Sequence, residues 1–360
     1  WFVPPPPAPP MILWGDLKQN TFSQTGQTLL GYGLVAGLYI GYLPIILSIT
    51  NVCTHISMGP LLDPFWVGLA PTLGLTLMVS FLPTFLKMIF TSFFTLKAAA
   101  WAQQKLQIWY FWFQVVFVIL ATAVGQDVVG FTQVLFSDPM LIFRKMAQTL
   151  PFATHFYMNY LVLQCTTHAL CILRYVNLSK YLGFKALYED EEAAAMAEPE
   201  DQDYYGIGSR SARWTINMLI GIIFGTLCPP MCLLCFGLFA AIRVIYGYLI
   251  PFAETRKADL GGAFWTSQLT HLFYGNMIYV VLMTSVLLDR AANYGPALIA
   301  FPSLIYVIWS HVRFQTAFNW EKLPFQELMR PESQALSDKM TKREITGKYM
   351  QPELFPEALE

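Results

Sequence analysis

The chain has 360 residues, of which 55% are hydrophobic and only 12% are charged. A soluble domain carries about 25% charged residues, so this composition excludes an ordinary soluble protein and places the chain in a membrane. The 22 basic and 23 acidic residues leave a net charge of -1, which creates no overall field that would attract nucleic acid. We therefore expect an integral membrane protein that does not bind nucleic acid.

The first segment, residues 1–26, starts at Trp1 and is rich in proline. Proline cannot form the apolar helical core of a signal peptide. We interpret residues 1–26 as a cytosolic segment that enters the membrane domain, and the chain as a fragment or a processed form of a longer protein.

Eight hydrophobic blocks follow, and their lengths approach the roughly 20 apolar residues that a helix needs to cross a bilayer. A helix is expected for each block because it satisfies its own backbone hydrogen bonds in lipid. The sequence therefore predicts an all-α polytopic membrane protein. The blocks cover residues 27–50, 67–92, 107–131, 149–175, 214–229, 231–250, 264–288 and 296–313.

The fourth block carries a polar stripe. At about 100° per residue, His155, Asn159 and Thr166 fall within about 40° of one another, whereas Gln164 lies on the opposite side. Polar groups at this depth are costly unless they face water or a partner, so we predict that the three stripe residues line a pathway. Hydrogen bonds to a neighbouring helix are the competing interpretation.

Two aromatic residues, Phe156 and Tyr160, lie beside this stripe and are four residues apart. Their rings are bulky enough to close a narrow, water-filled constriction by dewetting. We name them as gate candidates, while noting that aromatic pairs at helical spacing also occur in ordinary helix cores.

The fifth and sixth blocks are short and meet at Pro229 and Pro230. Two missing amide donors, and the restriction on the residue before a proline, favour a sharp turn. We expect a hairpin that is broken at these two prolines.

The sequence contains no zinc-binding or phosphate-loop motif. The closest candidate cluster is Cys228, Cys232 and Cys235, but the two prolines interrupt the helical face that would unite them. We expect no catalytic residue, no metal and no cofactor, and we do not expect an enzyme.

The basic residues predict the orientation, because they are retained on the cytoplasmic side of short loops. If the first block runs outward from the cytoplasm, only Arg144, Lys145 and Arg290 of the 22 basic residues fall outside. The C-terminus is then cytoplasmic.

This topology divides the chain into five parts. The first four membrane helices, in residues 27–175, form the pore half, and the remaining membrane helices occupy residues 214–313. Residues 176–213 form an acidic cytosolic linker, and residues 314–360 form a cytosolic tail. The fifth part is the entry segment at residues 1–26.

Several short motifs occur in a fixed order along nearly the whole chain. They are Ala8-Pro9-Pro10-Met11-Ile12-Leu13-Trp14-Gly15-Asp16-Leu17, Phe81-Leu82-Pro83, Pro151 with Phe156, Tyr157 and Tyr160, Cys228-Pro229, Asp259-Leu260-Gly261-Gly262-Ala263-Phe264-Trp265, and Tyr349 with Pro352. In this order they resemble the hyperosmolality-gated, calcium-permeable OSCA channels, which are relatives of the anoctamins.

The resemblance implies an anoctamin-like architecture with a pore inside each subunit, formed by the first five blocks and opened by membrane tension or osmotic stress. It implies a calcium-permeable cation channel of the plasma membrane or an endomembrane. Membrane lipids, permeating cations and a second copy of the chain are the implied partners. Two other functions stay open, namely a non-conducting structural or accessory subunit and a lipid scramblase.

The pore helix departs from the family pattern. Gln164, Cys165 and His168 stand where a carboxylate and hinge glycines are common, and Ile172 replaces a later acid. Val115 occupies a position where asparagine is usual. The sequence therefore does not predict an ion preference.

Overall fold

The protein is described by a computed structural model. It describes residues 2–3, 12–17, 21–56, 59, 63–121, 144, 147–148, 153–197, 206–254, 260–317 and 323–324. Regular structure in these residues is almost wholly helical, so the prediction of an all-α fold is confirmed. The strands described, β1 (Phe2–Val3) and β2 (Leu323–Pro324), form one short antiparallel pair. The rest of the predicted tail, beyond the end of the last helix, lies outside the described residues.

Each of the eight predicted blocks contains a helix, and two of these helices continue into a π-helix. In chain order they are α2 (Thr21–His55), α3 (Asp63–Phe93), α4 (Ala99–Gln114) with η2 (Val115–Ala121), α8 (Thr154–Leu170), α12 (Ile207–Gly225), α13 (Pro230–Tyr248) with η4 (Leu249–Ala253), α14 (Ala263–Arg290) and α15 (Gly295–Ala317). The end of the third block, after Ala121, is outside the described residues.

Within the described residues, four helical stretches are long and apolar enough to cross a membrane. They are Thr72–Phe93, Pro230–Ala253, Ala263–Arg290 and Gly295–Ala317. Their outer surfaces carry exposed apolar side chains such as Phe236 and Ile299, which lipid tails can cover. The helical lengths and these surfaces agree with an integral membrane protein.

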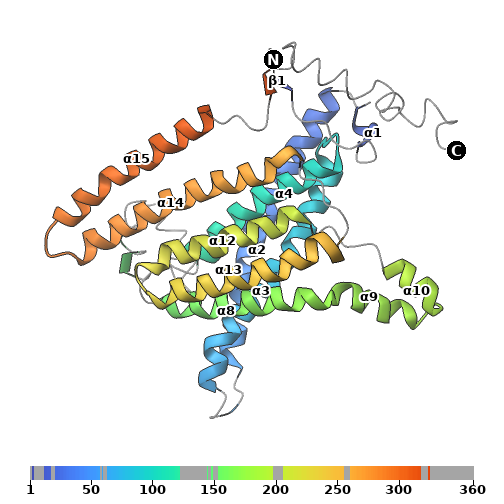
Figure 1. Cartoon of the computed structure of the whole chain (residues 1–360), viewed down its shortest axis with the longest axis horizontal. Coiled ribbons are helices and arrows are strands. Elements are labelled where there is room, and N and C mark those ends of the chain that lie inside the picture. The colour runs from blue at the N-terminus through green and yellow to red at the C-terminus, as the bar shows by residue number, and fades with distance from the viewer. Residues whose placement is uncertain are drawn as a thin grey trace.

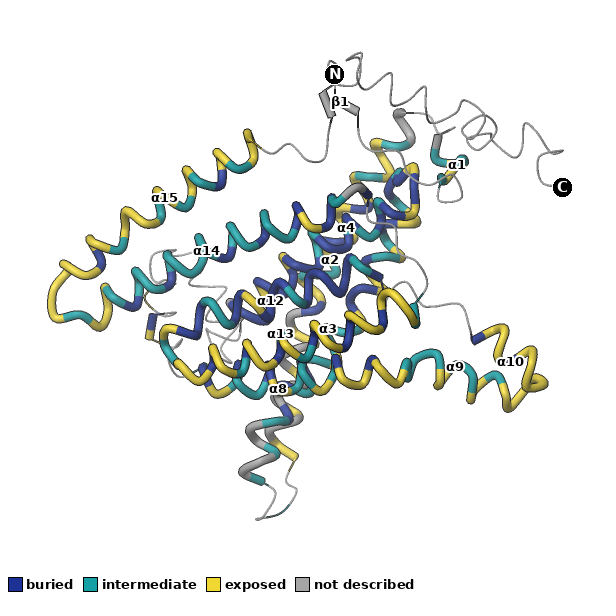
Figure 2. Tube along the Cα trace, viewed as in Figure 1, coloured by how far each residue is buried: buried dark blue, intermediate teal, exposed yellow. Residues whose placement is uncertain are grey.

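The centre of the fold is α12, which packs against α4, α13 and α14 (Figure 1). Figure 2 shows buried residues along most of α12, whereas α15 is largely exposed. The second half of α12, residues 218–225, is entirely apolar, and such a segment is stable only when neighbours or lipid surround it. Ile216 and Phe224 of α12 and Phe111 and Phe113 of α4 are fully buried in the core that results.

The start of the membrane region is tied to the turn between α3 and α4. Asp16 lies in the short helix α1 (Trp14–Leu17), and its Oδ2 accepts hydrogen bonds from the backbone N–H groups of Leu96 at 2.9 Å and Lys97 at 3.2 Å. Backbone N–H groups in a turn need hydrogen-bond acceptors, and the Asp16 carboxylate accepts from two of them. Asp16 belongs to the first of the motifs quoted above, and this contact gives that motif a structural reason.

The acidic segment after α8 is mostly helical where the structure describes it. The 3-10 turn η3 (Cys171–Leu173) leads into α9 (Tyr175–Lys185), and α10 (Asp190–Ala197) folds back on α9 away from the main bundle (Figure 1). Lys185 Nζ pairs with Asp190 Oδ1 at 3.1 Å, and this hydrogen bond raises the pKa of Lys185. The predicted linker 176–213 thus contains α9, α10 and the beginning of α12.

The α12–α13 hairpin turns at residues 226–229, where Pro229 and Pro230 were expected to cause a break. Cys228 N–H donates to Phe224 O at 2.8 Å, which closes the end of α12. Pro230 is the first residue of α13. Proline is tolerated there because the first N–H groups of a helix have no intrahelical acceptor.

Candidate functional site

The polar stripe of α8 lies on the outer side of the helix. His155 and Thr166 are exposed and Asn159 is partly buried. The Thr166 hydroxyl donates to Val162 O of its own helix at 3.2 Å. A side chain on the wall of an open conduit and a side chain that faces acyl chains are both exposed, so the pore-lining role of His155, Asn159 and Thr166 stays a prediction.

The two gate candidates lie in different surroundings. Tyr160 is 1% exposed and belongs to the core, whereas Phe156 packs against the core from a partly buried position. Between them, Tyr157 is fully buried, stacks on Phe224 of α12 at 4.0 Å and donates its hydroxyl to Ile119 O of η2 at 2.9 Å. The role of Phe156 and Tyr160 as a gate stays a prediction. Tyr157 has a different role, because its contacts hold α8 against η2 and α12.

The opposite side of α8 is buried and polar. Gln164 is 3% exposed and His168 is 1% exposed. Gln114 at the end of α4 and Asn217 in α12 are among the further amides that are fully buried in the same bundle. In the described structure, the side-chain oxygen and nitrogen of Gln114 and of Asn217 have no hydrogen-bond partner. The side-chain oxygen of Gln164 also has none.

These buried amides are energetically costly. A buried polar group without a hydrogen bond costs about 1–3 kcal/mol. The cost falls if water or an ion reaches the amide, so the three positions mark where a polar species would be stabilised inside the bundle. They come from α4, α8 and α12, which all belong to the first five blocks.

A buried ion pair lies at the end of the bundle where α12 begins. Arg210 Nη1 and Nη2 donate to Glu254 Oε2 and Oε1, each at 2.9 Å, and both side chains are 2% exposed. The ring of Tyr246 lies 4.6 Å from the Arg210 guanidinium carbon. This two-pronged geometry suits a buried guanidinium, because it satisfies charge and hydrogen bonds together. The pair joins the first turn of α12 to the residue after η4.

Tyr246 connects this ion pair to α8. Its hydroxyl donates to Cys171 Sγ at 3.6 Å and lies 2.8 Å from His168 Nδ1. Because the hydroxyl hydrogen is directed to Cys171, we assign the donor in the second contact to His168 Nδ1–H. We call Arg210, Glu254, Tyr246, His168 and Cys171 the Arg210–Glu254 network, and it joins α8, α12 and the end of α13.

Sequence reasoning missed the Arg210–Glu254 pair and the roles of Gln114 and Asn217. The signal for the pair was the presence of charged residues next to the ends of two apolar blocks. The signal for the amides was a polar residue within an apolar block. Only the structure shows which of these residues meet. Among the described residues, no group of three or more His, Cys, Asp or Glu is placed to hold a metal ion.

Residues 35–287 match the family model for the calcium-dependent channel, 7TM region. The chain belongs to this channel family. The assignment made from the sequence motifs is therefore confirmed at the level of the family. The matched range starts within α2 and ends within α14, so it contains the α8 stripe, the buried amides and the whole Arg210–Glu254 network.

Two fungal proteins are similar to this member of the calcium-dependent channel family. Uncharacterized protein RSN1 of Saccharomyces cerevisiae is 20% identical over 329 residues, which cover 86% of this chain and 34% of that protein. Uncharacterized membrane protein C24H6.13 of Schizosaccharomyces pombe is 26% identical over 194 residues, which cover 49% of this chain and 22% of that protein. The chain thus matches 34% of the length of the first relative and 22% of the length of the second.

Proposed function

We propose that the chain forms the pore region of a calcium-permeable cation channel that opens under membrane tension or osmotic stress, with one pore in each subunit. Membership of the calcium-dependent channel family supports the channel class. The observation that carries the pore is the set of buried amides, Gln114, Gln164 and Asn217, in the interior of a membrane helix bundle.

An ion needs a polar route through the bilayer. The idealised cost of moving an ion from water into a medium of low dielectric constant is of order 20 kcal/mol, so conduction requires a continuous wet path. Buried amides of α4, α8 and α12 provide polar groups along such a path once the helices separate. Tyr157 of α8 and Phe224 of α12 stack with ring centroids 4.0 Å apart, and this contact supports a closed state in which the two helices stay together.

Tension opens the channel by favouring a wider conformation. Membrane tension shifts the equilibrium between the closed and the open state only if the two states differ in their area in the membrane. Separation of α8 from α12 would supply this difference in area. The orphaned amides favour the separated state because they gain hydration there, and the aromatic packing favours the closed state. This balance supports a channel that stays shut at rest.

The two sides of α8 are alternative pore walls. The interior side is better supported, because Gln164 is buried with an unsatisfied oxygen whereas the Thr166 hydroxyl already has an acceptor. Replacement of Gln164 by leucine should reduce single-channel conductance if the interior side lines the pore. The matched change Thr166→Val should then leave conductance unchanged, and the opposite result would assign the pore to the outer stripe.

The channel itself is tested by recording from stretched membrane patches that contain the full-length protein. We expect tension-activated currents that calcium can carry. Silence of protein that reaches the surface normally would contradict the proposal and favour a non-conducting accessory subunit. Transfer of labelled lipid between leaflets of protein-containing vesicles, without ion current, would instead identify a scramblase.

A further inference from the structure

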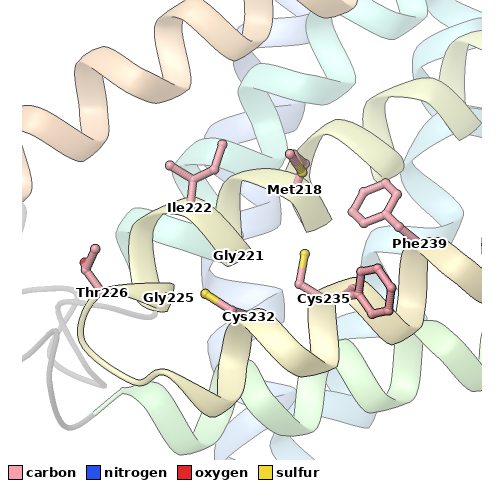
Figure 3. A pocket seen from close by; sticks show the side chains of 9 residues that line it. Met218, Gly221, Ile222, Gly225, Thr226, Cys232, Cys235 and Phe239 are labelled. Carbon is pink, nitrogen blue, oxygen red and sulfur yellow. The ribbon is translucent and has the colours of Figure 1, made fainter.

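A groove lies between α12 and α13 on the half of the hairpin nearest the turn (Figure 3). Its volume is about 670 Å³, within the range of pockets that bind small molecules. Its lining residues come from α12 and α13 and from Thr226 just after α12. They are Met218, Gly221, Ile222, Gly225, Thr226, Cys232, Cys235, Phe236 and Phe239.

The groove is apolar almost throughout. Among the lining residues that the structure describes, Thr226 alone carries an alcohol group, and its hydroxyl already donates to Met283 Sδ of α14 at 3.6 Å. The two cysteines contribute thiols, which pack as small apolar groups. None of the described residues that line the groove is charged, so an ion or a lipid headgroup would find no charged partner among them.

Two glycines form the floor of the groove. A Cβ at Gly221 would lie 2.5 Å from Cys235 Sγ, and a Cβ at Gly225 would lie 2.5 Å from Cys232 Sγ. The two sulfur atoms therefore occupy the space that side chains at positions 221 and 225 would fill. This allows α12 and α13 to approach closely at these glycines. Phe236, which is 73% exposed, and Met218, which is 40% exposed, stand at the rim.

The position of the groove identifies what surrounds it. The α13 side of the groove, from Cys232 to Phe239, belongs to the candidate membrane span Pro230–Ala253, so lipid is the expected surrounding of the groove. From Met218 to Thr226 it follows α12 for about 12 Å at 1.5 Å per residue. One leaflet contributes about half of the roughly 30 Å hydrocarbon core, so the groove matches the reach of a single acyl chain.

We propose that this groove binds one hydrocarbon chain of a bilayer lipid. The chain lies along Gly221 and Gly225 between the rims formed by Met218 and Phe236, and its headgroup stays at the turn beside Thr226. An unfilled apolar groove would lose dispersion contacts along its walls, and the neighbouring acyl chains are the molecules that can restore them. This inference depends on the groove alone and not on whether the protein conducts ions.

The proposal is tested with the full chain in phosphatidylcholine vesicles that contain a lipid with a photoreactive diazirine on its acyl chain. After irradiation, mass spectrometry should place the cross-links mainly on groove residues such as Met218, Cys232 and Phe236. The exposed face of α15, for example at Ile299, reports contact with bulk lipid. Equal labelling of α15 and the groove would mean ordinary surrounding lipid and would overturn the proposal.

A variant whose side chain fills the groove should be labelled less by the lipid probe. The variant Cys232→Trp places an indole over Gly225, and we expect groove labelling to fall about tenfold, the effect of excluding roughly two methylene groups from apolar contact. The matched control is Leu233→Trp, which adds the same ring at the neighbouring residue, itself 74% exposed and outside the groove lining. Labelling of this control should stay at the level of the parent.

Three further measurements keep the proposal open to refutation. If Cys232→Trp does not elute as a single folded species, Met218→Trp fills the groove from the other helix and should give the same loss. Labelling by a photoreactive sterol in place of the acyl probe would contradict an acyl-chain site. Efficient linkage of Cys232 to Cys232 of a second copy by a short bis-maleimide would show that protein covers the groove, which would also overturn the proposal.

Discussion

Arg210 and Glu254 carry opposite charges at a place where both side chains are 98% removed from solvent. Such a pair gains little net stability over an apolar substitute, because each ion must first be taken out of water. Removal of one partner is a different matter, since the other charge then stays buried without compensation. The pair therefore fixes the position of α12 against the end of α13 more than it adds to overall stability.

The variant Glu254→Gln should destabilise the protein strongly. It leaves the Arg210 charge buried with a neutral amide, and the expected loss in the free energy of unfolding is about 3–5 kcal/mol. Denaturant unfolding in detergent micelles would measure this loss. The matched control is Asp190→Asn in the exposed pair with Lys185, where solvent screens both charges and we expect little change. Equal effects of the two variants would refute the account of a buried pair.

Phe156 and Tyr160 differ in burial, so their replacement should have different side effects. Phe156→Ala and Tyr160→Ala should both raise basal current in unstretched patches if the rings close the pore by dewetting. Tyr160→Ala also opens a cavity in the core, where loss of a large ring costs about 3–5 kcal/mol of stability. Phe156→Ala is the cleaner test, and unchanged basal current at normal surface expression would remove Phe156 from the gate.

At the scale of the elements, α12 determines the packing. It lies against α4, α13 and α14, and close approach to α14 depends on Gly275. A Cβ at Gly275 would collide with the fully buried side chain of Leu219 in α12. At the other end of α12, Gly208 lies against the backbone of Gln103 in α4 in the same way. Small residues at such contacts allow membrane helices to pack by van der Waals contact.

The variant Gly275→Ala should separate α14 from α12 and lower stability by about 1–3 kcal/mol, the usual cost of overpacking a core. The midpoint of thermal unfolding in detergent would report it. The matched control is Gly237→Ala in α13, where an added methyl group meets no atom within 4 Å. Alanine is the better helix former, so this control should be neutral or slightly stabilising. A similar loss in both variants would mean that contact with Leu219 is not the cause.

For the whole molecule, the conduction route depends on which side of α8 faces the space between helices. The family resemblance places a carboxylate near Gln164, and this chain has an amide there. The variant Gln164→Glu should therefore raise the calcium permeability relative to monovalent cations, because a carboxylate binds a divalent ion more strongly than an amide does. Reversal potentials in calcium and potassium gradients would measure it.

The variant Thr166→Glu is the counterpart on the outer stripe. It should leave the reversal potential unchanged if the interior route conducts. If Thr166→Glu alters calcium permeability and Gln164→Glu does not, the outer stripe of His155, Asn159 and Thr166 is the wall of the pore.

Insertion in a membrane, the eight helical blocks and the family were all readable from the sequence by itself. Each depends on properties of consecutive residues, because transfer of an apolar stretch into lipid and the lack of an amide in Pro229 and Pro230 act locally. The angle between His155 and Gln164 around α8 was also predictable, because it follows from the helical period.

Only the tertiary structure decided which of these two sides is buried, since the helical period does not say where the neighbouring helices lie. It also decided that Arg210 meets Glu254, 44 residues later, and that glycines of α12 lie opposite cysteines of α13 to leave a groove. Such contacts depend on the packing of several helices at once, where shape and the satisfaction of polar groups outweigh the preferences of any one segment.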